Sequence, residues 1–557
     1  MEEAYAKKPW LKFYDKDIPP SLTYPSITYG DYIRPIFEKF PDRVAFYYLG
    51  IEVTYRELDA LSNQFAAFLI QHGCKAGDTV GCHLPNVPAA YIAAIGIQKA
   101  GCVFTGVSAL LTPDELQYQL NDSGTKVLVT MDLLFGAVGK VIADTGVKAV
   151  LVTSATDYLP APPGGAPPGD LERFPGIEVA RFAEALKAMP SDLVRVKIDP
   201  GDNMLMMFTG GTTGPPKGAI LTHNNIVHHC VQMSTWLHVV AGSSVILTAF
   251  PMFHQAGNFL SLSHMAMGSS LVVVPNPRDL QAVIAAIKQY KPTIIVNVPT
   301  IFLELMKLPE FRALDFSNID FFMSGASAFP AENIKEFEDI VGKNKLVEVC
   351  GMTETSPVIT SLPHLGMKKV GSVGLPLSDT EIRLVDPETG KVVGVGEPGE
   401  LVAKGPQVFT KGYHNKPEET AHALRDGWIY TGDIEVMDED GYFYIVDRLK
   451  DMVSVSGFKV FTRQVDDILI EHPDIDVAAT VGLPDPKRPG SEIVASAIIL
   501  KPGLEKDEAM KKKITAYMKE KVAPYKVPKI IEFRDSLPMS AVGKILKREL
   551  RKIMEVK

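Results

Sequence analysis

The segment at residues 209–218 carries the strongest chemical signal in this sequence. It reads TGGTTGPPKG and follows an apolar run at 204–208. Its four glycines and three threonines allow backbone amides and hydroxyls to turn inward around phosphate oxygens, and Lys217 adds a positive charge. It is not a Walker A loop, because prolines precede the lysine and no Ser or Thr follows it. The composition predicts a phosphate loop, and the plainer alternative is a flexible surface turn.

Five shorter motifs follow downstream. They are SGASA at 324–328, CGMTE at 350–354, YTGD at 430–433, DRLKD at 447–451 and PMSAVGK at 538–544. Glu354 offers the hard oxygen ligand that Mg²⁺ prefers, and the carboxylate of Asp433 can accept two hydrogen bonds at once. Taken singly, such residues are more often solvated surface charges or turn residues. Their number and order favour a shared site.

Helical and strand patterns alternate along the chain and would position these motifs. Thr54 followed by Glu57 predicts a capping box at the start of a helix, and residues 112–115 repeat this start signal. Residues 279–290 have helical spacing, whereas residues 293–298 are rich in the β-branched types that favour strands. This alternation predicts an α/β fold built in layers.

The last third of the chain has a different pattern of predicted elements, which suggests a second structural unit. Residues 392–446 contain short strand-like runs divided by Gly and Pro, which predict a small β-rich subdomain. We expect an N-terminal domain over 1–446, a hinge over 447–451 and a small α+β C-terminal domain over 452–557. The proline-rich stretch 160–168 predicts an exposed loop within the first domain.

Length and composition narrow the class of protein. A chain of 557 residues is too long for one ordinary core, and its net charge of −9 provides no general attraction for nucleic acid. The five cysteines form no C-x-x-C pair, which favours a reducing cytoplasm. Residues 1–10 lack the apolar core of a signal peptide, and residues 89–111 are interrupted by Gln98 and Lys99. We therefore expect 89–111 to be buried α/β core rather than a membrane span.

In this order, the motifs resemble those of the adenylate-forming (ANL) superfamily, which includes acyl-CoA synthetases, adenylation domains of peptide synthetases and beetle luciferases. The resemblance spans most of the chain and is greatest to AMP-forming medium- and long-chain fatty-acid-CoA ligases. It implies an acid-thiol ligase that forms an acyl-adenylate and pyrophosphate from ATP, then acyl-CoA and AMP. ATP, Mg²⁺ and coenzyme A would be the required small molecules, with no tightly bound prosthetic group. It also implies that the C-terminal domain is mobile.

The resemblance assigns roles to individual residues. It implies catalytic roles for Lys544, Glu354, Thr353 and His254. It implies ATP or AMP contacts from Thr209, Gly210, Gly211, Thr212, Thr213, Gly214, Lys217, Gly325, Ala326, Ser327, Cys350, Gly351, Met352, Thr353, Asp433, Arg448 and Lys544. Glu354 and Thr212 would hold the metal, and Lys450 would be the hinge pivot. CoA would meet Gly457, Phe458 and Lys459.

The same resemblance indicates which kind of carboxylic acid the protein would use as substrate. The acyl pocket would be formed by Phe253, His254, Gly257, Ala326, Gly351 and Met352. Gly351 stands where acetate-specific relatives have a tryptophan, and residues 250–257 contain no carboxylate to bind an amino group. These features favour an uncharged acyl tail, either aliphatic or aryl and alicyclic.

Several alternatives share the adenylation motifs. A luciferase-like oxygenase and a carrier-protein-loading enzyme differ only in what happens to the adenylate. A non-catalytic acyl- or nucleotide-binding protein of the same fold is disfavoured, because Lys544, Glu354 and Asp433 are all present. The sequence leaves open a homodimer, peripheral membrane contact without a transmembrane segment, and control by acylation of Lys544.

Two departures from the superfamily pattern stand out. Thr462 and Gln464 replace a usual proline and glutamate, which concerns local packing of the C-terminal domain. Cys350 occupies the position of a usual aromatic residue that packs on adenine, and a thiol offers less stacking area.

We predict that Cys350→Tyr tightens ATP binding, because it restores an aromatic face for the adenine ring. Isothermal titration calorimetry with ATP measures the change. An unaltered affinity in a folded variant contradicts the interpretation.

Overall fold

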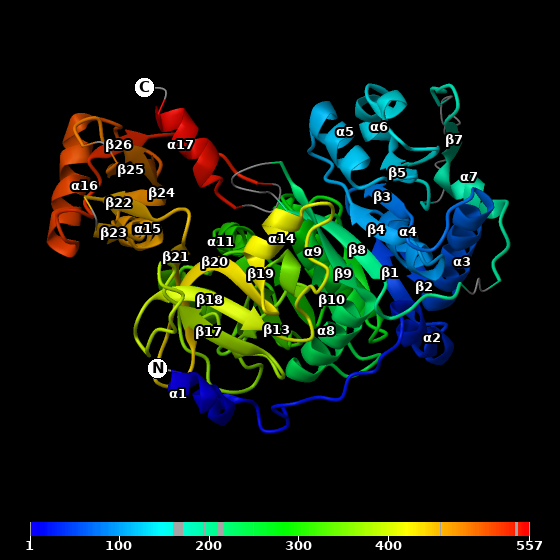
Figure 1. Ribbon diagram of the computed structural model, residues 1–557, viewed down its shortest axis with the longest axis horizontal. Coiled ribbons are helices and arrows are strands. Elements are labelled where there is room, and N and C mark those ends of the chain that lie inside the picture. The colour runs from blue at the N-terminus through cyan, green and yellow to red at the C-terminus, as the bar shows by residue number, and fades with distance from the viewer. Residues whose placement is uncertain are drawn as a thin grey trace.

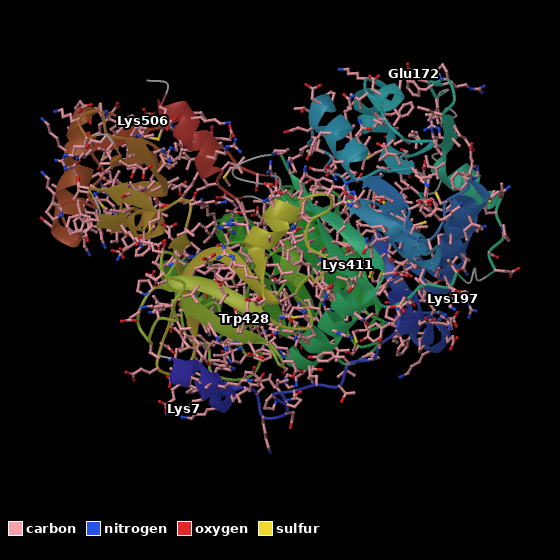
Figure 2. The ribbon with its side chains drawn as sticks, in the orientation of Figure 1. Lys7, Glu172, Lys197, Lys411, Trp428 and Lys506 are labelled. Carbon is pink, nitrogen blue, oxygen red and sulfur yellow. The ribbon has the colours of Figure 1, made fainter. Side chains whose placement is uncertain are left out.

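The computed structural model describes residues 2–159, 171–192, 196–209, 215–248, 250–456, 458–488, 490–540 and 544–555 (Figure 1). Within these ranges the chain forms a nine-stranded and a seven-stranded sheet, a five-stranded sheet, and a smaller C-terminal unit. The predicted loop at 160–168 lies outside the described residues. The charged side chains of Lys7, near the N-terminus at the lower left, and of Lys506, in the C-terminal unit at the upper left, lie on the outside of the molecule (Figure 2).

The nine-stranded sheet is mainly parallel and has the order β16-β15-β14-β13-β12-β10-β11-β1-β2. Its strands are β1 (Val44–Tyr48), β2 (Ile51–Thr54), β10 (Val245–Thr248), β11 (Ser270–Val273), β12 (Ile294–Asn297), β13 (Phe321–Ser324), β14 (Leu346–Cys350), β15 (Thr360–Ser361) and β16 (Leu375–Pro376). Successive residues point to opposite faces, so Ile294 joins one core and Ile295 another. The predicted strand at 293–298 is confirmed.

One face of this sheet is covered by helices whose apolar residues form a separate core with it. These helices are α10 (Leu280–Tyr290), α11 (Pro299–Met306), α12 (Pro309–Arg312) and α13 (Ala331–Val341). The predicted helix at 279–290 is confirmed, with Asp279 as its N-cap accepting a hydrogen bond from the Ala282 amide at 3.0 Å. The other face packs on the large core shared with the second sheet.

The seven-stranded sheet has the order β7-β6-β5-β3-β4-β8-β9 and is parallel except for the β8–β9 pair. Its strands are β3 (Thr79–His83), β4 (Val103–Gly106), β5 (Val127–Met131), β6 (Ala149–Thr153), β7 (Glu178–Arg181), β8 (Asn203–Thr209) and β9 (Lys217–Thr222). The helices that precede or connect these strands along the chain are α3 (Tyr55–Gln71), α4 (Pro88–Lys99), α5 (Pro113–Asp122), α6 (Asp132–Gly139), η2 (Ile142–Asp144) and α7 (Phe182–Lys187). The alternation expected for an α/β fold is confirmed.

Local sequence signals account for several of these boundaries. Capping boxes start α3 at Thr54 and Glu57 and α5 at Thr112 and Glu115, as predicted. Helix α4 is buried almost all round, which agrees with its uniformly apolar sequence and with the expectation for 89–111. No described helix has the length and apolar character to cross a membrane.

The N-terminal segment reaches the five-stranded sheet, where the ring centroids of Trp10 and Phe443 are 6.3 Å apart. Five further helices of the described chain precede that sheet, besides the short 3₁₀ helix η3 (Thr353–Thr355). They are α1 (Glu2–Ala6), η1 (Pro9–Phe13), α2 (Tyr29–Lys39), α8 (His223–Trp236) and α9 (Gln255–Met265). Helices α8 and α9 pack on each other, with the ring centroids of His229 and Phe259 4.4 Å apart. These two helices border the candidate site.

The five-stranded sheet is antiparallel and begins earlier than the sequence predicted. It contains β17 (Glu381–Val385), β18 (Gly399–Lys404), β19 (Leu424–Arg425), β20 (Trp428–Met437) and β21 (Phe443–Arg448), with α14 (Pro417–Ala423) between β18 and β19. Strand β17 was missed, although all five of its residues pair with β18. Asp447 and Arg448, expected in a hinge, are paired with β20.

The C-terminal unit is an α+β structure, as expected. It contains β22 (Val453–Val455), β23 (Phe458–Val460), α15 (Thr462–Ile470), β24 (Ile475–Pro484), β25 (Glu492–Leu500), α16 (Glu508–Lys521), β26 (Ile530–Phe533) and α17 (Lys547–Glu555). The chain before α17 runs from this unit back to the centre of the molecule (Figure 1). There Arg278 donates to the carbonyl of Ser540 at 3.3 Å.

The backbone at Gly374 packs closely against β15, the strand that pairs with β14 beside the site. Gly374 has φ +95°, and a Cβ there would lie 2.0 Å from the carbonyl carbon of Ser361. Ser361 lies in β15 and pairs with Val349 of β14. Only glycine fits this contact without moving β15.

We predict that Gly374→Ala lowers the melting temperature by several degrees more than Gly50→Ala. Both positions have positive φ, which costs an L-residue about 1–2 kcal/mol, but a Cβ at Gly50 meets nothing within 4 Å. The clash at Gly374 adds about 1–3 kcal/mol of overpacking. Thermal unfolding followed by circular dichroism compares the variants, and equal melting temperatures contradict this account.

Candidate functional site

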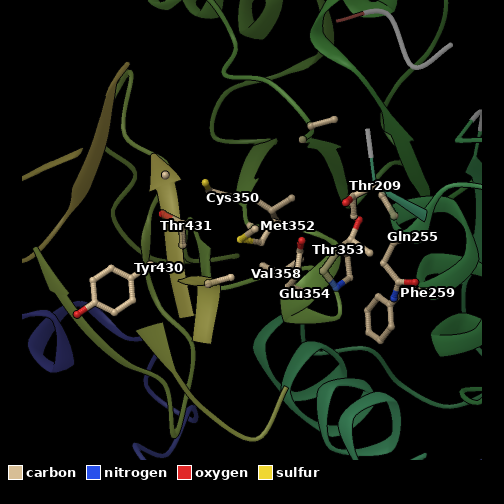
Figure 3. Close-up of a pocket in the computed structure, with 18 of the residues that line it drawn as sticks. Thr209, Gln255, Phe259, Cys350, Met352, Thr353, Glu354, Val358, Tyr430 and Thr431 are labelled. Carbon is tan, nitrogen blue, oxygen red and sulfur yellow. The ribbon is translucent and has the colours of Figure 1, made fainter. Parts of the chain in front are cut away.

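A cavity of about 1180 Å³ lies where β14, the five-stranded sheet, α8, α9 and the C-terminal segment meet. Figure 3 shows Gln255 and Phe259 on one side of it and Tyr430 and Thr431 on the opposite side. Most of the residues predicted from the sequence line it. They are Thr209, Lys217, His254, Gly325, Ala326, Cys350, Gly351, Met352, Thr353, Glu354, Arg448, Lys450 and Lys544.

The predicted phosphate loop begins and ends at this cavity. Thr209 closes β8, Lys217 opens β9, and the two residues are paired across the hairpin. The intervening Gly210, Gly211, Thr212, Thr213 and Gly214 lie outside the described residues. The ammonium of Lys217 lies 4.9 Å from the ring centroid of Tyr413.

Glu354 is held in place by a residue that the sequence analysis missed. Its carboxylate is buried and accepts a hydrogen bond from the Tyr413 hydroxyl at 2.5 Å. Burial raises the pKa of Glu354, while the Tyr413 hydroxyl and Lys217 lower it in part. A short bridge from Tyr413 to Ala219 of β9 links this pair to the phosphate loop.

Backbone without bulky side chains forms the wall between β13 and β14. A Cβ on Gly351 would lie 2.0 Å from the carbonyl oxygen of Pro357, and one on Gly325 would lie 2.8 Å from Val349 Cγ2. Ala326 has φ +70°. Ser327, in the same predicted segment, is not among the lining residues. The two glycines therefore allow the chain to pack closely on itself at this edge of the cavity.

Cys350 points toward another buried acid that the sequence analysis missed. Its sulfur lies 3.8 Å from Oε1 of Glu435, which is 1% exposed. Burial, then the charge of Asp433, raises the pKa of Glu435 to about 8, so this side chain is mainly protonated at neutral pH.

At the predicted sugar motif, Arg448 lines the cavity and forms an ion pair with Asp433, which is not itself among the lining residues. Arg448 Nε lies 3.0 Å from Asp433 Oδ1, and these residues also pair across β20 and β21. Asp433 keeps a second carboxylate oxygen that can accept hydrogen bonds. Lys450, the predicted pivot, lies two residues beyond Arg448 and also lines the cavity.

Lys544 brings a positive charge from the C-terminal segment into this polar region. Burial, followed by repulsion from Arg448, lowers its pKa to about 8, while Asp433 acts in the opposite direction. Its amide donates to Ser540 Oγ at 3.0 Å, and its carbonyl accepts from the Ser540 amide at 2.7 Å. The ammonium form therefore predominates at pH 7 and is lost as the pH rises through about 8.

Of the described CoA residues predicted from the sequence, Lys459 contacts a residue that lines the cavity, whereas Phe458 is not shown near it. Lys459 forms a 2.7 Å ion pair with Glu388, which lines the cavity. Phe458 is 57% exposed and stacks on Tyr525 of the same unit. Gly457 lies outside the described residues.

The remainder of the cavity is largely apolar and lies between α8 and α9. Its lining includes Cys230, Met233, Ser234, Leu237, Val239, Phe250, Gln255, Phe259, Leu260, Ser263, His264 and Met267. The α9 residues recur at helical spacing, a pattern that is visible in the sequence. The predicted acyl pocket nevertheless included no α9 residue beyond Gly257. Gly257 and Phe253 do not line the cavity, and their backbone instead packs closely on Pro251 and Gly106.

His254 and Gln255 stand where the apolar part meets the polar part. Burial, then the charge of Lys544, lowers the pKa of His254 to about 4, so the ring is neutral at pH 7. Its Nδ1 accepts from the Ala256 amide at 3.3 Å, which leaves Nε2 as the protonated nitrogen. Gln255 is 1% exposed, and neither amide atom has a partner in the described part of the chain.

Comparisons with known proteins agree with this geometry. A family model described as AMP-binding enzyme matches residues 35–414, and one described as AMP-binding enzyme C-terminal domain matches residues 464–544. The chain is 38% identical to a long-chain-fatty-acid–CoA ligase of Bacillus subtilis (strain 168), over 98% of each chain. It is 32% identical to a feruloyl-CoA synthase of an Amycolatopsis species, over 92% of this chain and 96% of the relative.

A solved structure extends the similarity to the fold. The anthranilate CoA ligase AuaEII in complex with anthranoyl-AMP superimposes with a TM-score of 0.85 at 26% identity, covering 96% of this chain and 98% of that one.

We predict that Tyr413→Phe moves the acid-side loss of MgATP affinity to higher pH. The lost hydrogen bond stabilises the carboxylate of Glu354, so its removal raises the pKa and protonation begins at higher pH as the pH falls. Calorimetric titration with MgATP across a pH series measures the midpoint. Tyr442→Phe is the control, because its hydroxyl bonds to the Met367 carbonyl and not to Glu354; identical midpoints in wild type and Tyr413→Phe contradict the prediction.

Proposed function

The chain belongs to the AMP-binding enzyme family, and from this membership we propose that it is an AMP-forming acid-thiol ligase that converts a long-chain fatty acid into its acyl-CoA. The observation that carries the proposal is one cavity that joins a polar end, with Lys544, Glu354 and Arg448, to a long apolar part. A nucleotide and an aliphatic acid would then meet at the junction.

In the first half-reaction, a carboxylate oxygen of the acid attacks the α-phosphorus of ATP. A phosphorus–oxygen bond forms, the bond to the pyrophosphate oxygen breaks, and pyrophosphate leaves. Lys544, which lines the same cavity, would supply positive charge to the carboxylate and the α-phosphate. The buried surroundings strengthen that interaction and keep water from the acyl-adenylate.

The nucleotide would be held by the groups around the polar end. Asp433 would accept hydrogen bonds from the ribose hydroxyls, and the strand ends at Gly325 and Gly351 would border adenine. Lys217 would lie near the phosphates.

Glu354 fits an Mg²⁺ ion that accompanies ATP. Mg²⁺ keeps several waters and is commonly bound by one or two carboxylates together with substrate phosphates. No cluster of three His, Cys, Asp or Glu side chains suited to a metal occurs in the described residues, and a single buried carboxylate beside a phosphate loop meets the need. When bound, the ion would neutralise phosphate charge.

In the second half-reaction, the CoA sulfur attacks the acyl carbonyl, a carbon–sulfur bond forms, and AMP leaves with the bridging oxygen. Lys459, which pairs with Glu388 of the cavity lining, and the exposed Phe458 would contact CoA after a rotation about Lys450. That rotation, with the boundary at 447–451, remains part of the proposal.

The acid is proposed to be aliphatic because the far part of the cavity is deep and its lining carries no charge. Met233, Leu237, Leu260 and Met267 would contact the chain. Similarity to a feruloyl-CoA synthase keeps an aryl acid as the second candidate. We place the enzyme in the cytoplasm, where its five free thiols stay reduced.

The test is to incubate the protein with ATP, Mg²⁺ and CoA and, separately, acetate, octanoate, hexadecanoate or ferulate, and to quantify AMP and acyl-CoA by chromatography. Equal amounts of both, with hexadecanoate preferred, support the proposal. ADP as the nucleotide product refutes it. A preference for ferulate shows that the second candidate, an aryl acid, is the substrate in place of an aliphatic acid.

We predict that Lys544→Ala slows acid-dependent exchange of pyrophosphate into ATP by about 100-fold or more, since a preorganised charge at the reacting atoms is lost. In the wild type the exchange rate should decline as the pH rises through about 8. Lys552→Ala is the matched control, because this exposed lysine of α17 pairs with Glu549 away from the cavity. If Lys544→Ala exchanges pyrophosphate into ATP at the wild-type rate, Lys544 does not take part in adenylation.

A further inference from the structure

A buried chain of hydrogen bonds links the five-stranded sheet to the C-terminal unit. Asp447 lies in β21 and pairs with Ile434 of β20, so its backbone belongs to that sheet. Its carboxylate accepts hydrogen bonds from the amide of Thr462 and from the Thr462 hydroxyl, the latter at 3.0 Å. Thr462 is the first residue of α15 in the C-terminal unit. Asp447 is 4% exposed and Thr462 is fully buried, so both ends of this contact are shielded from water.

Thr462 also contacts the last helix of the chain. Its hydroxyl oxygen accepts a hydrogen bond from the Lys547 ammonium at 2.7 Å, and Asp466, one turn further along α15, accepts another at 2.7 Å. Burial lowers the pKa of Lys547, but attraction to Asp466 and Asp447 outweighs this effect and raises it, so the side chain is charged at pH 7. The Thr462 hydroxyl therefore donates to a carboxylate and accepts from an ammonium group.

Lys547 lies three residues beyond Lys544, whose charge the proposed adenylation requires. The Leu546 amide donates to the Pro538 carbonyl at 2.8 Å, and the Lys544 carbonyl accepts from the Ser540 amide at 2.7 Å. These two contacts hold the segment that carries Lys544 against the segment that precedes it. Because Lys547 follows directly after Leu546, its attachment to α15 fixes the point from which Lys544 extends into the cavity.

These contacts cross the predicted hinge at Lys450. Asp447 precedes Lys450 and Thr462 follows it, so the rotation proposed above would move Thr462 away from Asp447. The contact is therefore confined to orientations close to this one, in which Lys544 lines the cavity. Hydrogen bonds to charged groups are stronger than those between neutral groups, so their loss disfavours the rotated orientation.

The residue at position 462 makes the connection possible. Thr462 stands where the superfamily pattern usually has a proline. A proline has no amide proton and no hydroxyl, so it could not donate to Asp447 and could not accept from Lys547. The connection therefore depends on one of the two departures of this sequence from that pattern.

We propose that Asp447, Thr462 and Lys547 form a latch that positions Lys544 in the cavity for adenylation. They are positioning residues, because none of the three lines the cavity and each acts through the backbone that carries Lys544. The inference rests on the proposed function for the role of Lys544. The placement of Lys544 by the latch can be measured without turnover.

The test determines the pKa of Lys544 in the full-length protein. Lysines are labelled in trace amounts with acetic anhydride across a pH series, and the label on Lys544 is quantified by mass spectrometry. In the wild type the pKa should be about 8, because burial and then repulsion from Arg448 lower it. A lysine in water has a pKa of about 10.4. In Thr462→Pro, which loses the latch, we expect the pKa of Lys544 to rise to about 9 or higher.

The fold should accept this proline. Position 462 is the first of its helix, where no hydrogen bond within the helix is lost, and Phe461 has the extended backbone required before a proline, with φ −80° and ψ 111°. Thr462→Ser keeps the amide and the hydroxyl and should retain the wild-type pKa of Lys544. Thr462→Val removes only the hydroxyl and should give an intermediate value. Ser496→Ala is the control for lost stability alone, because it removes a buried hydroxyl that is hydrogen-bonded with Thr480 at 2.7 Å in the same unit.

The outcomes separate this inference from the proposed function. The latch is refuted if Lys544 has an ordinary pKa in the wild type, if a folded Thr462→Pro keeps the wild-type pKa, or if Ser496→Ala raises it equally. Should Thr462→Pro not fold, Thr462→Val decides, and a wild-type pKa of Lys544 in that variant refutes the latch. The expected order of pKa values supports the latch even where no acyl-CoA is formed, a result that would count against the ligase activity alone.

Discussion

The active-site arrangement depends on bringing one buried ammonium group, that of Lys544, from the C-terminal unit into a cavity formed by the N-terminal part of the chain. Taking a charge out of water is costly, and the lowered pKa of Lys544 reflects that cost. Repulsion from Arg448 adds to this cost, and attraction to Asp433 partly offsets it. A phosphate and a carboxylate beside Lys544 would supply negative charge, so the cavity is electrostatically suited to the proposed substrates.

Contacts between the two units maintain this placement. Arg278 bonds to the Ser540 carbonyl, Lys459 pairs with Glu388, and Lys307 lies 3.6 Å from Asp476. These are partly exposed ion pairs and single hydrogen bonds, which are individually weak. Weak contacts are compatible with the proposed rotation, in which the C-terminal unit would release Lys544 after adenylation and present another face to CoA. By contrast, the cavity walls are built from close backbone contacts, such as that of Gly351 with Pro357, which do not yield easily.

Local chemistry in the sequence predicted much of this structure, and long-range pairing explains the rest. The capping boxes at Thr54 and Thr112 and the N-cap at Asp279 depend on neighbouring residues, so they were readable. Tyr413 has no local signal, because its value comes from contact with Glu354, 59 residues away. Glu435 was missed for the same reason. Strand β17 is short, and its pairing with β18 rather than its own composition makes it a strand.

In the proposed mechanism an oxygen of the acid attacks the α-phosphorus beside Lys544, so AMP departs with an oxygen from the carboxylate. The most direct measurement uses hexadecanoate labelled with ¹⁸O in its carboxylate, together with ATP, Mg²⁺ and CoA, and mass spectrometry of the products. The mechanism predicts one labelled oxygen in AMP and none in pyrophosphate. Label in pyrophosphate or in inorganic phosphate, or unlabelled AMP formed alongside acyl-CoA, would contradict it.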